Sequence, residues 1–279
     1  MNWNVALSTG IFLSEPLPTI LPRIRESGLR LIEVSAFTAH FDYKDLDLVQ
    51  KTGDDMHKLG LRAISMHSPY SKEIDVTMLN EVDRKHSVAE IEIAIDALAI
   101  LGGTKLVVHA GSEAEEANGQ IPKRLSQSLR SLTEIYNYCQ KRDIKLVIEN
   151  MLGHLVGGRI QELQWILSRL PRQNVGVCLD SGHSFLAKNL LKAVRTFAPN
   201  LSLVHAHDNK GIYDDHLPPG EGKIDWPKFL DALAAARFEG DIVIEVLGGN
   251  GGRDVLERVR QSVVFLKDCS LGKTYSLDV

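Results

Sequence analysis

Residues of the types that bind metal ions close six successive apolar runs of this chain. Each run is rich in Val, Ile and Leu, and a polar turn follows each one. If the runs are parallel strands of one barrel, their carboxyl ends meet on one face and these side chains converge there. Imidazoles and carboxylates on one face predict a divalent metal site. The residues at the run ends are His67, His109, Glu149, Asp180, His205 with His207, and Glu245.

Two of these residues, Glu149 and Glu245, are embedded in strongly apolar sequence. Glu149 follows Leu-Val-Ile, and Glu245 lies within the run Ile-Val-Ile-Glu-Val-Leu. An unpaired buried charge costs several kcal/mol, and converging carboxylates raise each other's pKa unless a cation lies between them. A bound ion is the simplest remedy. Mixed imidazole and carboxylate donors favour zinc, manganese, cobalt or iron over calcium or magnesium.

A later segment offers a second set of ligands. Positions two apart in an extended chain face the same way, so Asp214 and His216 could bind one ion together, with His183 completing the set. We favour His205 over His207 as the ligand of the strand-end site because His205 lies at the end of its run. His207 then supports a ligand or contacts the substrate.

Two other residues of the apolar runs could have either a functional or a structural role. Glu33, within the run 31–35, is either a substrate contact or part of a salt bridge that plugs the barrel. Cys178 has apolar neighbours, which favour a place in the barrel core over a nucleophilic role. Histidines outside the apolar runs, at positions 40, 57, 86 and 154, are expected to be exposed.

The elements that must position these residues alternate between strands and amphipathic helices. Helical spacing of apolar residues is clear in segments such as 81–101 and 122–141. Eight strand-helix units in this length predict a single domain, 1–279, folded as an α/β (β/α)8 TIM barrel. A nucleotide-binding open sheet would need a glycine-rich turn after the first strand, and residues 9–13 do not provide one. Strands are expected near 3–9, 29–36, 61–67, 104–109, 144–149, 175–180, 201–207 and 241–247.

Composition narrows the class of protein. Lys and Arg number 32 against 36 Asp and Glu, a net charge of −4, so no strong basic field attracts nucleic acid or anionic lipid. No apolar run approaches the roughly 20 residues needed to cross a bilayer, so no membrane partner is expected. The three cysteines cannot all pair within the chain, which fits a reducing, cytoplasmic location. The oligomeric state stays open, and a homo-oligomer is compatible with the sequence.

The residues around the seventh strand resemble a known family. The segments His-Ala-His-Asp-Asn-Lys-Gly (205–211) and Asp-His-Leu-Pro-Pro-Gly-Glu-Gly-Lys-Ile-Asp-Trp (215–226), with the strand-end ligands, resemble the xylose isomerase-like TIM barrel superfamily. That superfamily contains sugar isomerases and epimerases together with endonuclease IV-type repair enzymes. The resemblance implies a metal site at Glu149, Asp180, His205 and Glu245. In the epimerases a histidine three residues after the aspartate contacts substrate, a role that it implies for His183.

The resemblance also covers the three-zinc pattern of the endonuclease branch. The positions concerned are His67, His109 and Glu149 for one ion, Asp180, His205 and Glu245 for the second, and His183, Asp214 and His216 for the third. The sequence of residues 205–226, in contrast, resembles that of the branch described as sugar phosphate isomerases or epimerases. Tyr70 fits both branches, since it could wedge into DNA or cover a sugar.

We therefore expect an enzyme that binds one to three divalent ions (Zn, Mn or Co) and acts on a sugar or sugar phosphate. Glu149 and Glu245 would exchange a proton at the carbon beside a carbonyl, through an enediolate. The alternative is an endonuclease IV-like, multi-zinc phosphodiesterase that cleaves DNA at abasic sites, and only this alternative has nucleic acid as a partner. A third reading, a catalytically silent barrel, is disfavoured by the complete ligand set.

Overall fold

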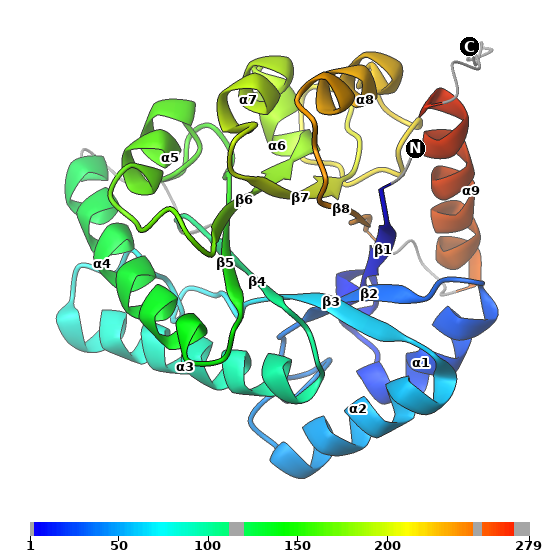
Figure 1. Ribbon diagram of the computed structural model, residues 1–279, viewed down its shortest axis with the longest axis horizontal. Helices are drawn as coiled ribbons and strands as arrows, with labels where there is room; N and C mark the ends of the chain where they lie inside the picture. Colours follow the sequence, from blue (N-terminus) through cyan, green and yellow to red (C-terminus); the bar gives the residue numbers. More distant parts are fainter. Residues whose placement is uncertain (1–2, 112–119, 248–252, 271–279) are drawn as a thin grey trace.

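Eight parallel strands close into a barrel in sequence order, each hydrogen-bonded to its neighbours along the chain, and β8 pairs with β1 (Figure 1). The computed structural model describes residues 3–111, 120–247 and 253–270. All eight expected strands are present in these ranges, which confirms the predicted (β/α)8 barrel. The strands are β1 (Val5–Ser8), β2 (Leu31–Ser35), β3 (Arg62–His67), β4 (Lys105–His109), β5 (Lys145–Glu149), β6 (Val175–Asp180), β7 (Leu201–Ala206) and β8 (Asp241–Ile244).

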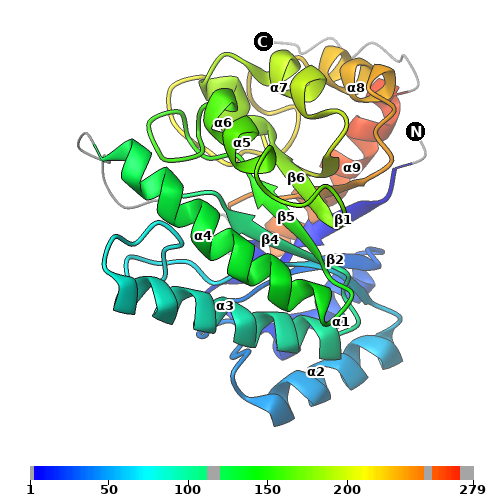
Figure 2. The same ribbon diagram turned by 60° about the vertical axis from the view of Figure 1, so that its left-hand side comes forward.

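The helices form a ring outside the strands (Figure 1), and α3 and α4 run side by side along one flank (Figure 2). The two helices expected from apolar spacing, α3 and α4, begin and end within a residue of the expected bounds. The helices are η1 (Thr9–Phe12, a 3-10 turn), α1 (Leu17–Glu26), α2 (Leu46–Leu59), α3 (Glu81–Ile100), α4 (Ile121–Gln140), α5 (Ile160–Leu167), α6 (Ser181–Leu186), α7 (Leu190–Phe197), α8 (Trp226–Ala235) and α9 (Arg253–Ser270).

Two hydrophobic cores follow from the alternation of side chains along the strands. The larger core lies between the sheet and the helices, and a smaller one fills the barrel with Ala6, Val107, Val147, Leu203 and other residues. Cys178 belongs to the smaller core, as expected, and burial raises the pKa of its thiol. No helix of the described ranges is both long and apolar enough to cross a membrane.

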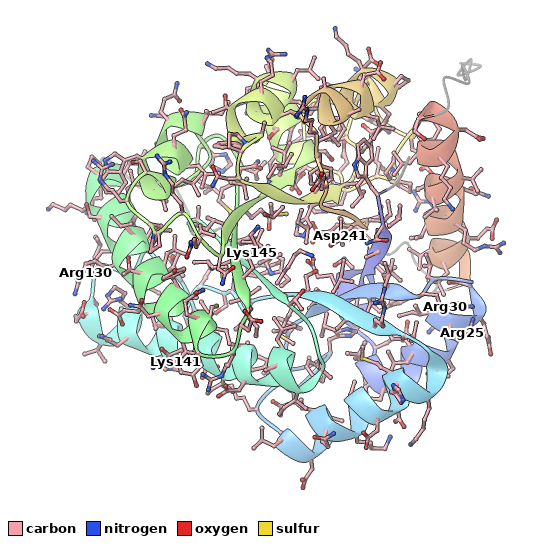
Figure 3. All side chains as sticks on the ribbon, viewed as in Figure 1. Arg25, Arg30, Arg130, Lys141, Lys145 and Asp241 are labelled. Carbon is pink, nitrogen blue, oxygen red and sulfur yellow. The ribbon has the colours of Figure 1, made fainter. Side chains whose placement is uncertain are left out.

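A buried carboxylate at the amino end of the barrel has partners for both of its oxygens. Asp241, the first residue of β8, accepts a hydrogen bond from Asn4 Nδ2 at 2.8 Å and pairs with Lys105 Nζ at 2.6 Å. Figure 3 places Asp241 and Lys145, the first residues of β8 and β5, near the centre of the ring. Every charged oxygen of Asp241 thus has a partner within the protein.

One exposure prediction is wrong. His40 is buried, and both of its ring nitrogens have partners. Nε2 lies 3.0 Å from Thr9 Oγ1, and Nδ1 lies 2.6 Å from the Glu15 carbonyl oxygen. It links the loop after β2 to the segment after β1. The signal was hidden because both partners are far from His40 in the sequence. The other three histidines outside the apolar runs are exposed, as expected.

Candidate metal centre

Strand register brings the four ligands implied for the shared metal site to one place. Asp180 pairs with His205 across β6 and β7, while Glu149 ends β5 and Glu245 directly follows β8. One ligand atom from each of these four side chains lies within 4.8 Å of the others, so the four could hold an ion. We call Glu149, Asp180, His205 and Glu245 the inner group.

His205 is the centre of the inner group. Its Nδ1 lies 3.1 Å from Glu149 Oε1 and 3.0 Å from Glu245 Oε2, and its Nε2 lies 2.9 Å from Glu33 Oε1. Burial lowers the pKa of this imidazole, but the surrounding acidic groups outweigh burial and raise it well above its usual value. Without another cation, protonated His205 is the charge that offsets the carboxylates around it.

Glu33 lies beneath His205 and is fully buried. Its second oxygen, Oε2, accepts a hydrogen bond of 2.7 Å from Ser65 Oγ. Of the two readings left open by the sequence, this geometry matches the ion pair inside the barrel. A carboxylate on the far nitrogen of an imidazole fixes the orientation of the ring and which nitrogen faces the site.

His67 and His109 flank the inner group on the β3 and β4 side. His67 Nε2 lies 3.3 Å from Glu149 Oε2 and 3.1 Å from His109 Nε2, and the three side chains could hold an ion. Burial lowers the pKa of His67, but Glu149 outweighs burial and raises it to about 9. Burial and the neighbouring His67 lower the pKa of His109 to about 3. Perturbed pKa values cluster at functional sites, and both of these buried histidines belong to one group of candidate ligands.

A further group of four residues lies beside the inner group. We call His183, His207, Asp214 and His216 the outer group, and their ligand atoms could also hold an ion. Asp214 Oδ2 lies 3.1 Å from both His183 Nε2 and His216 Nε2, as the expected His183, Asp214 and His216 set requires. His207 joins this set, since its ring stacks on that of His216 with centroids 3.8 Å apart.

Asp180 connects the two groups. Its Oδ2 lies 2.8 Å from His207 Nε2, and its Oδ1 accepts a hydrogen bond from the backbone N–H of His183. Asn150 supports both contacts, because its side-chain oxygen accepts from the Asp180 N–H and its carbonyl oxygen lies 2.9 Å from His183 Nδ1. Asn150 was not among the predicted site residues, although its position directly after a strand-end ligand could have indicated a role.

The long β7–α8 loop, which carries three members of the outer group (His207, Asp214 and His216), is organised by Asp208. Its carboxylate accepts hydrogen bonds from the backbone N–H groups of Gly220 and Ile224 and from Trp226 Nε1. Gly222 lies so close that a Cβ there would be 2.1 Å from Asp208 Oδ1. Sequence reasoning missed Asp208, whose only signal was an aspartate after the seventh strand followed by a glycine-rich loop.

Tyr70 and the histidines line a cavity of about 380 Å³ at the carboxyl end of the barrel. The Tyr70 ring is 41% exposed and lies 4.4 Å from the His109 ring, centroid to centroid. Glu149 and Glu245 both line the same cavity, and none of its described lining residues is Lys or Arg. This volume is typical of a small-molecule site.

The donor set fits a divalent ion on grounds beyond residue type. Several buried atoms that face the two groups have no hydrogen-bond partner among the described residues: Glu149 Oε2, His207 Nδ1 and Asp214 Oδ1. Burial raises the pKa of Asp214, but hydrogen bonds from His183 and His216 outweigh burial and lower it. Carboxylates and imidazoles are the donors that zinc, manganese and cobalt prefer, and an ion would displace the proton from each imidazole nitrogen that it binds.

The fold and this cluster define a class: a (β/α)8 barrel with a candidate metal centre at the carboxyl ends of its strands. The chain belongs to the xylose isomerase-like TIM barrel family, whose model matches residues 21–269. The resemblance inferred from the sequence is therefore confirmed.

Relatives from both branches are similar to this chain. A solved structure of a D-tagatose 3-epimerase-like protein is 25% identical, with a TM-score of 0.85, and the match covers 97% of this chain and 98% of that one. A probable endonuclease 4 of Mycobacterium leprae is 24% identical over 74% of this chain and 81% of its own length. The uncharacterized protein MJ1311 of Methanocaldococcus jannaschii is 27% identical over 88% of this chain and 84% of its own length.

Proposed function

We propose that this protein is a metal-dependent epimerase or isomerase of ketose sugars or their phosphates. The observation that supports this most is the position of Glu149 and Glu245 against the same atom, His205 Nδ1, within one small cavity. Two carboxylates beside one bound substrate can act as the base and the acid of a proton exchange.

The residues of the inner group divide the work of such a reaction. An ion held by them would polarise the substrate carbonyl as a Lewis acid and favour loss of the proton from the adjacent carbon. One glutamate removes that proton, and the other, carrying a proton, returns one to the opposite face of the enediolate. His205, whose ring is oriented by Glu33, contacts both glutamates and holds their carboxylates in fixed positions.

Within the proposed class, the cavity lining favours a ketose without a phosphate group over a ketose phosphate, and it also disfavours a phosphodiester. Its described residues include histidines, acids and Tyr70 but no Lys or Arg to pair with phosphates. These polar side chains suit the hydroxyls of a ketose, and the Tyr70 ring packs beside the His67 ring with centroids 5.1 Å apart. The similarity to the D-tagatose 3-epimerase-like protein over almost the whole of both chains supports the same substrate class.

A second candidate is a multi-ion phosphodiesterase that acts on abasic DNA. The observation that favours it is the set of ligand groups: His67, His109 and Glu149, then the inner group, then the outer group. This pattern supplies donors for three ions, and the similarity to probable endonuclease 4 proteins supports it. A ketose epimerase needs only the ion of the inner group.

The test compares the two activities in one preparation loaded with Mn, Co or Zn. We expect epimer formation from at least one member of a panel of ketoses and ketose phosphates, and no cleavage of an abasic-site duplex. His67→Ala, His109→Ala and His216→Ala should each lower epimerisation by about tenfold, through poorer substrate positioning. His86→Ala, at an exposed position on α3, is the matched control and should leave the rate unchanged.

Duplex cleavage that disappears in all three of these variants, with no ketose converted by the wild type, would overturn the proposal in favour of the phosphodiesterase.

A further inference from the structure

A groove on the outer rim of the barrel is lined by a concentration of positively charged side chains. It lies where α7, α8 and the β7–α8 loop meet, outside the cavity of the metal centre, and its volume is about 600 Å³. Its cationic side chains are exposed, and none has an ion pair with a described residue. They are Lys188, Lys192, Arg195, Lys210, Lys223 and Lys228.

Only one carboxylate, Asp225, is among the described lining residues of this basic groove. Its side chain already accepts a hydrogen bond from the backbone N–H of Lys228, so it caps α8. The whole chain has a net charge of −4, so the groove contrasts with the rest of the protein. Like charges that share one groove repel one another, and a bound anion would relieve that repulsion.

Backbone dipoles add to the positive potential. Asn189 and Leu190, at the start of α7, line the groove. Asn189 makes no capping hydrogen bond with its side chain, so the first N–H groups of α7 lack a side-chain acceptor there. Helix N-termini favour anions such as phosphate groups.

Apolar residues complete the lining. Phe185, Leu190 and Leu191 line the groove together with the cations. Such a surface suits a ligand with an apolar or aromatic part as well as its charges. A nucleic acid strand is less suited, because the neighbouring mouth cavity has no Lys or Arg among its described lining residues to continue the basic track.

We propose that the basic groove binds a small polyanion with an aromatic part, of the class represented by a nucleoside diphosphate. The phosphates contact the lysines around the N-terminus of α7, and the aromatic part packs on Phe185 and the two leucines. The site is separate from the metal centre and does not depend on the reaction catalysed there. Lys210 belongs to the loop that also carries Asp214, so the two sites are neighbours.

Isothermal titration of the metal-loaded protein with ADP, pyrophosphate and inorganic phosphate tests this. We expect ADP to bind more tightly than pyrophosphate, and pyrophosphate more tightly than phosphate. The double variant Lys192→Glu with Lys223→Glu should weaken ADP binding at least tenfold. The control is Lys51→Glu with Lys58→Glu, which makes the same change of net charge on α2, across the barrel from α7 and α8 (Figure 1).

Four results would overturn the proposal: no ADP binding at millimolar concentration, equal binding by the two double variants, binding abolished by a chelator, or tighter binding of an oligonucleotide of equal phosphate content. Circular dichroism checks that the double variant is folded. If it is not, Lys192→Gln alone must still weaken ADP binding by about threefold, and an unchanged affinity would count against the site.

Discussion

The two ends of the barrel treat buried charge in opposite ways. At the amino end, Asp241 has Lys105 and Asn4 as partners, and both of its oxygens are satisfied. At the carboxyl end, three carboxylates surround His205, and atoms such as Glu149 Oε2 have no hydrogen-bond partner among the described residues. The buried carboxylate at the amino end is fully paired, whereas the carboxyl end is arranged to receive a cation. In a barrel of this kind, the amino end of the sheet contributes to stability and the carboxyl end carries the active site.

Among mutations at the two ends of the barrel, we expect the largest effect at His205. His205→Ala removes the one group that contacts both proposed catalytic glutamates, so metal affinity should fall at least 100-fold and the melting temperature should fall with it. Elemental analysis after dialysis and thermal melts with and without added metal measure both effects. Asp180→Ala should behave in the same way. Unchanged metal content in both variants would move the ligand role to His207.

The amino end should respond to mutation in stability alone. Asp241→Ala leaves Lys105 without its partner and is expected to cost about 2 kcal/mol of unfolding free energy, because Lys105 is still partly hydrated. Metal content and catalytic rate should stay at the wild-type level. Asp55→Ala, on the exposed face of α2, is the matched control and should not shift the melting temperature measurably. Loss of metal from Asp241→Ala would mean that the two ends are coupled.

The pH dependence of the chelated protein sharpens the comparison further. Burial lowers the pKa values of His67 and His216, but neighbouring carboxylates outweigh burial and raise both values to about 9. A histidine whose pKa is higher in the folded state than in the unfolded state stabilises the folded protein. This stabilisation is fully present below about pH 6.5, the unfolded-state pKa, and is lost as the pH rises through 9. Melting of the chelated protein should therefore show a loss on the order of 1 kcal/mol over this window.

Metal competes with those protons, so the loss at alkaline pH should disappear in the loaded protein. Identical pH profiles of the melting temperature with and without metal would contradict an ion at these histidines.

The sequence predicts most of what the strands carry and less of what the loops arrange. Glu149, Asp180 and His205 stand at the ends of apolar runs, and parallel register alone brings such positions together. The eight strands and the long helices follow from periodicity for the same reason. Each of these predictions depends on a local sequence pattern that is compatible with only one type of secondary structure.

The roles of His207 and Asp208 could not be read from local patterns. Whether His207 contacts Asp180 or the substrate depends on how the β7–α8 loop folds back, and Asp208 fixes that loop through N–H groups 12 to 18 residues away. Glu33 was ambiguous because only the closed barrel shows which strand faces it across the interior. Contacts across long loops and across the barrel are tertiary, and a single sequence does not specify them by spacing.

Incorporation of deuterium from D2O into the carbon-bound position of a ketose tests the central claim most directly. The metal-loaded wild type should exchange that proton, as mass spectrometry or NMR of the recovered sugar would show. Glu149→Gln and Glu245→Gln should each lower exchange by at least 1000-fold, because a neutral amide is not a base, while His86→Ala should exchange at the wild-type rate. Wild-type protein that exchanges with no ketose or ketose phosphate but cleaves an abasic duplex would contradict the account.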